Sequence, residues 1–259
     1  MNETNADGTG GRQLKSVART FEIIEHLRTD GEATLSEVAT AFDLPVSTAH
    51  IYLATLVESG YVIKEDGRYR CSLRFLQIGG ELRDRMALFR VAKDEVDNLQ
   101  QEYGENANVG TREAGYMVQL YKSENRDSID DNAPLGTHLH LHQTATGKAI
   151  LAELPEDEVD RVIDLRGLPQ STAATIKTRE ELKADLEQVR ERNYAINNGE
   201  HFPGVRAVAV PIVPKNESVV GAISISGPLS RMGQERIEDE LAPSLFDKRN
   251  VIELKLVQR

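Results

Sequence analysis

The chain has 259 residues, a single cysteine and a formal net charge of −11, an acidic surplus that suits either a salt-adapted, halophilic protein or an ordinary acidic cytosolic one. This length suffices for two domains, and the lone Cys71 excludes a disulfide framework and favours a reducing cytoplasm. No apolar stretch reaches the length of a membrane span, and the start lacks the core of a signal peptide.

The first segment, residues 1–11, consists largely of asparagine, threonine, glycine and acids, which predicts a disordered tail. Residues 16–27 follow as a predicted helix with Val17, Phe21, Ile24 and Leu27 turned inward. This helix would be the first of an N-terminal module that spans residues 12–72.

Residues 34–60 carry the pattern of a helix-turn-helix. Thr34 with Glu37 three residues on predicts a capping box, and Pro45 separates the first short helix from a second. Gly60 can adopt the left-handed backbone conformation that commonly ends a helix, so the second helix is predicted to end there. Its inward residues are predicted to be Ala49, Tyr52, Leu53, Leu56 and Val57. Its remaining face presents Ser47, Thr48, His50, Ile51, Ala54 and Thr55.

This remaining face is predicted to read DNA in the major groove. Positions 44–57 hold no charged residue, although charged residues make up 28% of the chain, and carboxylates on that face would be repelled by DNA. The next segment, residues 61–71, predicts a hairpin that turns at Asp66-Gly67. Lys64, Arg68 and Arg70 on this wing are expected to contact phosphates. The alternative is a small trihelical module used for protein contacts.

Two further helices, residues 73–86 and 89–103, are predicted to connect the two domains. Leu73, Leu76 and Leu82 offer apolar surface for self-association. DNA sites for helix-turn-helix modules are usually two-fold, so a homodimer or a dimer of dimers is expected.

The sequence pattern changes from residue 106, where predicted strands begin to alternate with predicted helices. Predicted strands cover residues 106–112, 116–122, 136–141, 194–198, 206–213 and 219–226. Predicted helices cover residues 144–154, 156–165, 179–192 and 234–256, and turns are marked by Gly115, Asn125 and Asn216. This order predicts an α+β domain with a mostly antiparallel sheet. The expected organisation is a tail over 1–11, a winged helix-turn-helix over 12–72, a linker helix over 73–88 and a second domain over 89–259.

The order and spacing of several short segments resemble the IclR family of transcriptional regulators over nearly the whole chain. In the N-terminal part they are Ser16-Val-Ala-Arg19, Leu44-Pro-Val-Ser-Thr-Ala-His50, Leu53-Ala-Thr-Leu56 and Gly60-Tyr-Val62. Further on they are Leu141-His142, Thr144-Ala145, Gly147-Lys-Ala149, Arg190-Glu-Arg-Asn-Tyr194, Gly204-Val-Arg206 and Ser224-Ile-Ser-Gly-Pro228.

This resemblance implies a winged helix-turn-helix that binds double-stranded operator DNA and a GAF-like effector domain that senses a small metabolite. It also implies an effector site made by Leu139, Ala145, Thr146, Asn197, Val205, Ala207, Ser224 and Ser226. The chain departs from the family's usual pattern at Ile51, where arginine is common, at Asn197, where an acid is frequent, and at Ala207, where cysteine is frequent. The family's ligands therefore do not carry over by analogy.

The residues themselves are compatible with such a site. Thr144 is predicted to open a helix, which would leave the amides of residues 145–147 free to attract a carboxylate. Ser224 and Ser226, two apart on a strand, share one face. Asn197 adds an amide, and residues 139, 205 and 207 give apolar walls. The plainer alternative is that Thr144 is an ordinary cap and that the serines satisfy a sheet edge.

His138, His140 and His142 alternate along a predicted strand, which would place three imidazoles on one face at a spacing compatible with metal. Only His142 matches the family pattern, so exposed strand histidines without a metal are the preferred interpretation. No cofactor is predicted.

Enzyme patterns are absent from the sequence. Gly147-Lys148 lacks the preceding glycine of a phosphate loop, and no Gly-x-Ser-x-Gly elbow exists. The preferred hypothesis is a transcription factor whose DNA affinity is set by a small organic acid or related catabolic metabolite. The alternatives are a metabolite-responsive enzyme or a metal sensor with an appended DNA-binding module, or a purely structural chromosome-binding protein.

Overall fold

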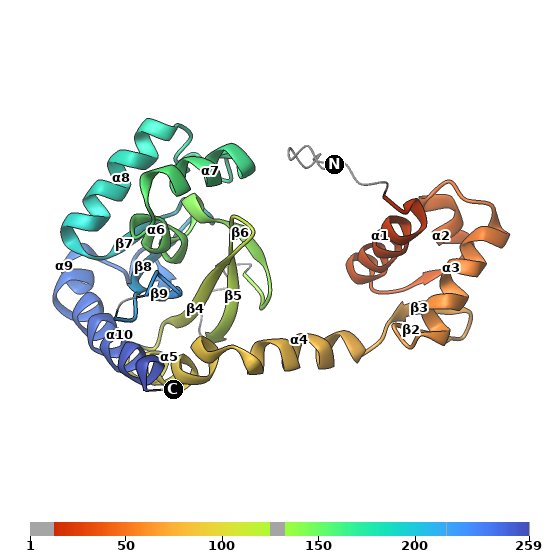
Figure 1. The fold of residues 1–259 in the computed structure, drawn as a ribbon, viewed down its shortest axis with the longest axis horizontal. Coiled ribbons are helices and arrows are strands. Elements are labelled where there is room, and N and C mark those ends of the chain that lie inside the picture. The colour runs from red at the N-terminus through yellow and green to blue at the C-terminus, as the bar shows by residue number, and fades with distance from the viewer. Residues whose placement is uncertain (1–12, 125–132, 216, 259) are drawn as a thin grey trace. The chain divides into compact units, whose positions relative to one another are not determined.

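The computed structural model describes residues 13–124, 133–215 and 217–258 (Figure 1). The chain divides into two compact units, Met1–Arg83 and Asp84–Arg259, and each is described by itself. The tail predicted over residues 1–11 and the turns predicted at Asn125 and Asn216 lie outside the described residues.

The N-terminal unit is a winged helix-turn-helix, as the sequence predicts. It contains α1 (Lys15–Asp30), α2 (Leu35–Ala41) and α3 (Val46–Glu58), followed by the wing strands β2 (Val62–Glu65) and β3 (Arg68–Cys71). The predicted capping box of Thr34 and Glu37 is present, and both turn residues, Asp66 and Gly67, have positive φ. A two-residue strand, β1 (Ala33–Thr34), pairs with β3 and was not predicted.

The core of this unit corrects the inward face predicted for α1. Ile23, Ile24 and Leu27 are buried, whereas Val17 is exposed and Phe21 is 63% exposed. The buried part of α1 begins only at Ile23, so the spacing of the apolar residues is helical but the described residues leave the apolar side chains of its first turns uncovered. In α3 the buried stripe is Ala49, Leu53 and Leu56, and Val57, predicted inward, lies one position further round the helix and is exposed.

Two helices follow, close to the predicted ranges. The first, α4 (Arg74–Arg85), has no buried residue. The second, α5 (Ala87–Tyr103), buries one face and ends at Gly104 in the left-handed conformation.

The C-terminal unit is built on a six-stranded antiparallel sheet with the order β6-β5-β4-β9-β8-β7. Its strands are β4 (Asn106–Glu113), β5 (Tyr116–Ser123), β6 (His138–His140), β7 (Ala195–Asn198), β8 (Val205–Ile212) and β9 (Gly221–Pro228). All six predicted strands exist, and each begins and ends within two residues of its predicted bounds. The α+β architecture is therefore confirmed.

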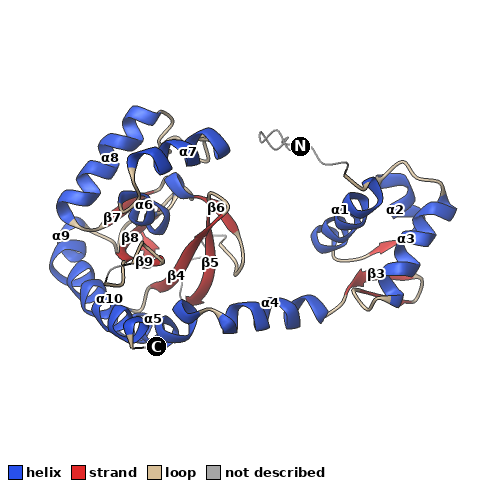
Figure 2. Cartoon of the chain, viewed as in Figure 1, coloured by secondary structure: helices blue, strands red, loops and turns tan. Residues whose placement is uncertain are grey.

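Helices cover both faces of this sheet (Figure 2). One face packs against α5 and α10 (Ala242–Val257) in a core that includes Leu99, Val109 and Leu245. The other face packs against α6 (Ala145–Ala152), α7 (Glu156–Arg166) and α8 (Arg179–Arg192). This second layer contains Met117 and Leu139, next to the polar residues described below.

The C-terminal helix predicted over residues 234–256 is present in three parts. A short α9 (Gln234–Arg236) leads into a π-helical segment, Ile237–Leu241, and then into α10. Pro243 stands at the start of α10, and proline lacks the amide hydrogen that would bond to residue 239 and crowds its carbonyl. We attribute the widened turn to this proline.

Candidate DNA interface and effector pocket

The predicted DNA-reading face is the solvent-exposed side of α3. Ser47, His50 and Ile51 are exposed and Thr48 is half-buried, while Ala49 and Leu53 on the opposite side are buried. Ile51 is 65% exposed, although it is a large apolar side chain. The face therefore offers a hydroxyl, an imidazole and an apolar surface to a partner, and it carries no fixed charge.

The wing cations predicted to contact phosphates all have partners within the unit. The Arg68 Nε atom lies 2.6 Å from Glu32 Oε1, and an Arg70 Nη2 atom lies 3.1 Å from Glu65 Oε2. The Lys64 ammonium lies 5.2 Å from the centre of the Tyr69 ring. The two arginines must therefore exchange a carboxylate for a phosphate if they bind DNA, which reduces what each contact adds.

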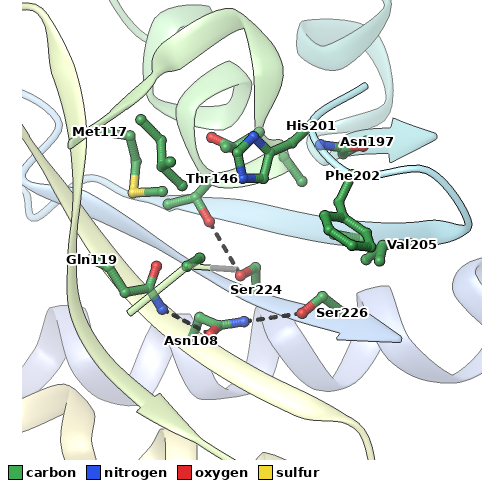
Figure 3. A pocket seen from close by; sticks show the side chains of 15 residues that line it. Asn108, Met117, Gln119, Thr146, Asn197, His201, Phe202, Val205, Ser224 and Ser226 are labelled. Carbon is green, nitrogen blue, oxygen red and sulfur yellow. Dashed lines mark hydrogen bonds between the residues drawn. The ribbon is translucent and has the colours of Figure 1, made fainter. Parts of the chain in front are cut away.

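The second candidate site is a pocket in the C-terminal unit, between α6 and the sheet (Figure 3). The space between its lining atoms amounts to about 500 Å³, part of which is open to solvent. All eight predicted effector residues line it, namely Leu139, Ala145, Thr146, Asn197, Val205, Ala207, Ser224 and Ser226. Sequence reasoning missed its other lining residues, which are Asn108, Met117, Gln119, Ala133, Thr144, His201 and Phe202.

Strand register brings the polar lining together from distant parts of the sequence. Asn108 of β4 lies opposite Ser224 of β9, and Ala207 of β8 lies opposite both Ser226 and Asn197. Residues directly opposite in an antiparallel sheet point to the same face, so all five side chains face α6. The predicted pairing of Ser224 and Ser226 on one face is thus part of a larger polar surface.

Hydrogen bonds connect these polar side chains in two groups, one of three residues and one of two. The Gln119 amide donates to Asn108 Oδ1 at 2.8 Å, and the Asn108 amide donates to Ser226 Oγ at 3.2 Å. The Thr146 hydroxyl of α6 donates to Ser224 Oγ at 3.1 Å (Figure 3). Buried polar groups need such partners, and these bonds hold the side chains in fixed orientations at the pocket wall.

The structure corrects two details of the predicted anion site. The amide of Gly147 donates to Thr144 Oγ1 at 2.9 Å, so only the amides of Ala145 and Thr146 remain for a ligand at this helix end. Asn197 lines the pocket, but its amide is used by the protein: it donates to the carbonyl of Gln143 and accepts from the amide of Glu200. Asn197 therefore fixes the loop at residues 199–202 to the start of α6.

Comparison with known proteins identifies the family. The model described as "IclR helix-turn-helix domain" matches residues 16–66, and "Bacterial transcriptional regulator IclR C-terminal" matches residues 81–252. The chain is 31% identical to the transcriptional repressor IclR of Escherichia coli over 247 residues, with 90% of this chain and 86% of that one covered. The chain belongs to the IclR family.

Other IclR-family proteins match over almost the full length. The "Probable HTH-type transcriptional regulator ArcR" of Halobacterium salinarum is 30% identical over 260 residues, 99% of each chain. The crystal structure of IclR from Thermotoga maritima superposes with a TM-score of 0.82 at 32% identity, covering 94% of this chain and 99% of that one. The chain is thus a DNA-binding transcriptional regulator with an effector-binding C-terminal domain, which confirms that part of the preferred hypothesis. The chemical class of the effector stays a prediction.

Behind the pocket of this IclR-family domain lies a fully buried lysine. The Lys148 ammonium, on α6, lies 2.9 Å from Glu200 Oε1 and 3.2 Å from Asp185 Oδ2. Burial raises the pKa of Glu200, and the charge of Lys148 opposes part of that rise. Because Glu200 directly precedes His201 and Phe202 of the pocket, this ion pair ties the pocket loop to α6.

The three histidines do not share one strand face. His138 and His140 of β6 flank the Tyr116 ring, with centroids 5.7 and 5.2 Å away, but the strand ends at His140. His142 lies in the 3-10 turn Leu141–Gln143, and its Nε2 atom lies 3.1 Å from the carbonyl oxygen of Pro169. Across residues 13–124, 133–215 and 217–258, no group of three or more histidine, cysteine, aspartate or glutamate side chains has the arrangement of a metal site.

Burial lowers the pKa of His142 to about 4, from an ordinary value of 6.5. The folded state therefore prefers the neutral ring, so the stability linked to this residue is complete above pH 6.5 and is lost as the pH falls toward 4. We expect the neutral state of His142 to account for a loss of about 2 kcal/mol of unfolding free energy in the C-terminal unit between pH 6.5 and 5. Urea unfolding at several pH values measures this slope. An unchanged slope in His142→Gln would contradict the assignment.

Each helix among the described residues is too short or too polar to cross a bilayer.

Proposed function

We propose that this regulator binds a two-fold operator as a homodimer through the exposed face of α3 and the wing, and that a small organic acid in the C-terminal pocket controls this binding. The observation that carries the proposal is the pocket itself. Residues from α6, β4, β5, β7, β8 and β9 converge on one space with a buried polar wall and a helix N-terminus. Such a site suits a small polar ligand.

Exposed apolar side chains support the homodimer. Leu14, at the start of α1, and Phe21 within it are exposed, and no residue of α4 is buried. Clustered exposed apolar residues mark an interaction surface. On α4 and its start these residues are Leu73, Leu76, Ile78 and Leu82. Leu73, Leu76 and Leu82 were predicted from the sequence for self-association. The exposed apolar side chains in the first turns of α1 provide further apolar surface of this kind.

The division of roles on the DNA side can be tested with a site selected from a random duplex library. His50→Ala removes the imidazole from the reading face, so sequence preference should relax at one base pair by roughly 1–3 kcal/mol. Lys64→Ala removes a wing cation that has no acid partner in the described residues, so all sequences should weaken alike and the salt slope should fall by about 1. Filter binding over a salt series measures both.

The selected sites also test the dimer, because a homodimer should recover two half-sites about one helical turn apart. Equal loss of sequence preference in both variants would contradict the assigned roles. A single unrepeated half-site would contradict the homodimer.

The effector half can be tested by replacing both pocket serines. Ser224→Ala with Ser226→Ala removes two neutral hydrogen-bonding groups, worth roughly 1 kcal/mol each, so the acid concentration for half-maximal DNA release should rise about tenfold to thirtyfold. DNA binding without ligand should be unchanged, because the reading face lies in the other unit. An acid found by thermal-shift screening of the wild type serves as the probe.

The matched control is Ser230→Ala, an exposed serine just beyond β9 that does not line the pocket. It should leave the half-maximal concentration unchanged. If the double variant responds like this control, the effector binds elsewhere.

A further inference from the structure

The two arginines of the wing project from one face of its strands, together with a carboxylate. In the pairing of β2 with β3, Glu65 lies opposite Arg68, and Ile63 lies opposite Arg70. Residues directly opposite in an antiparallel pair share a face, and so do residues two apart on one strand. Arg68, Arg70 and Glu65 are therefore on the same face of the wing, and the buried Tyr69 points to the other face.

Arg68 lies between two carboxylates. Its Nε atom is 2.6 Å from Glu32 Oε1, and its Nη2 atom is 3.7 Å from Glu37 Oε2. Glu37 already belongs to the capping box, where it accepts from the Thr34 amide at 2.7 Å, so Glu32 is the main partner. The contact with Glu32 lacks the angle of a hydrogen bond, because Arg68 Nε has no hydrogen-bond partner among the described residues. The attraction of opposite charges therefore holds the Arg68 guanidinium.

Arg70 is held by Glu65 across the hairpin. Its Nε and Nη2 atoms donate to the Glu65 carboxylate at 3.1 to 3.4 Å. These bonds are longer than the about 2.7–2.9 Å of a strong charged pair. Both arginines are partly exposed, and the side chains of Glu32 and Glu65 are more than half exposed. Water competes for such pairs, so the two arginines are restrained but can still exchange partners.

This pairing changes what a wing arginine contributes to DNA binding. A free arginine that neutralises a phosphate releases a condensed cation, so its contact contributes about −0.9 to the slope of log K against log salt. A paired arginine must first leave its carboxylate, and that carboxylate then attracts a cation of its own. Release and uptake nearly cancel. The contact therefore adds little affinity and little salt dependence.

The charge of the N-terminal unit strengthens this effect. Residues 13–72 carry nine aspartates and glutamates against six lysines and arginines. No general positive field therefore draws this unit to the DNA backbone, and the affinity for phosphates depends on the few cations that the acids leave available.

We propose that Glu32 and Glu65 form autoinhibitory contacts that hold Arg68 and Arg70 away from phosphates and keep the affinity for DNA of arbitrary sequence low. This inference rests on the proposed placement of the wing at the DNA backbone. Phosphate contacts carry no sequence information, so their suppression leaves more of the binding energy to the exposed face of α3.

Removing the carboxylates should strengthen DNA binding. Glu32→Gln and Glu65→Gln keep the length of the side chain and change exposed positions, so the fold should be retained. In filter binding of the full chain to a duplex of random sequence, each variant should raise the affinity about twofold to fivefold at about 0.1 M salt. Each should also steepen the salt slope by about 0.9 for every winged unit bound.

A double-mutant cycle separates the release of an arginine from the plain loss of a negative charge. In the background of Arg68→Met, which keeps an apolar stem, Glu32→Gln should no longer raise the affinity. Asp66→Asn is the matched control, because Asp66 is an exposed acid at the tip of the same wing and has no ion-pair partner among the described residues. Asparagine also tolerates the positive φ of this turn position. Any gain from Asp66→Asn should be the same with and without Arg68→Met.

The outcomes separate this inference from the wing placement on which it rests. If Lys64→Ala weakens binding but Glu32→Gln and Glu65→Gln do not strengthen it, the wing contacts DNA and is not autoinhibited. The inference is also wrong if the gain from Glu32→Gln persists in Arg68→Met, because the effect is then one of charge alone. If none of these variants changes the affinity or the salt slope, the wing does not contact phosphates, and both the placement and the autoinhibition fail.

Discussion

Replacing Lys148 by methionine should destabilise the C-terminal unit by about 3–5 kcal/mol. The lysine is fully buried, and its removal leaves Glu200, itself buried, without a counterion. Methionine fills the volume but cannot neutralise the carboxylate. Differential scanning calorimetry of the full chain should show the transition of this unit lowered by roughly 10 °C, with that of the N-terminal unit unchanged.

Two further variants separate charge from packing. Adding Glu200→Gln to Lys148→Met removes the stranded charge, so a large part of the lost stability should return. Lys183→Met is the matched control: this lysine also pairs with two acids, Glu156 and Asp160, but on the surface of α8, so its loss should leave the unfolding temperature almost unchanged. Equal effects from Lys148→Met and Lys183→Met would show that burial of the ion pair contributes nothing.

The pH dependence of the Lys148→Met effect has a definite sign. Burial already raises the pKa of Glu200, and without the charge and hydrogen bond of Lys148 that rise becomes larger. A carboxyl whose folded-state pKa is raised destabilises the fold as the pH increases through that value. The variant should therefore be closest to the wild type in mild acid and furthest from it above neutral pH.

The effector lining could be predicted in part because the family resemblance names positions directly. All eight residues so named lie around one pocket, although their binding role stays a prediction. Three of the seven residues that were missed come from β4 and β5, which pair with each other, and β4 also pairs with β9. Asn108 and Gln119 did leave a signal, since each is a polar residue in an inward position of a strand whose neighbours are apolar. Partners 11 and 118 residues apart, such as Gln119–Asn108 and Asn108–Ser226, become visible only with the register.

The DNA-binding unit shows why periodicity gives the helix but not always its buried face. In α1, the spacing of Val17, Phe21, Ile24 and Leu27 is helical, yet only the last two are covered. Which turns are buried depends on where the neighbouring elements end, and the sequence of the helix does not contain that information. The ion pair between Arg68 and Glu32 likewise could not be read from the sequence, because it joins the wing to the loop before β1.

The second large effect is expected at Gly147, where α6 lies directly against the backbone of Leu141. Gly147→Ala should cost at least about 3 kcal/mol and abolish effector binding. An added Cβ would lie 2.2 Å from the carbonyl oxygen of Leu141 and 2.6 Å from its Cα. These are backbone atoms and cannot rotate away, so α6 must move off the turn at Leu141–Gln143. That shift would break the bond from the Gly147 amide to Thr144 and displace Thr146 from Ser224.

Gly79→Ala provides the control, because it makes the same substitution in α4 at a position with no heavy atom within 4 Å of the added carbon. Alanine is the better helix former there by about 1 kcal/mol, so this variant should be as stable as the wild type or more stable. Calorimetry and ligand titration of both variants compare the two glycines directly. If Gly147→Ala unfolds at the wild-type temperature and still binds ligand, then α6 is not held against this turn as the structure shows. The N-terminus of α6 could then not be the fixed anion site of the proposed effector function.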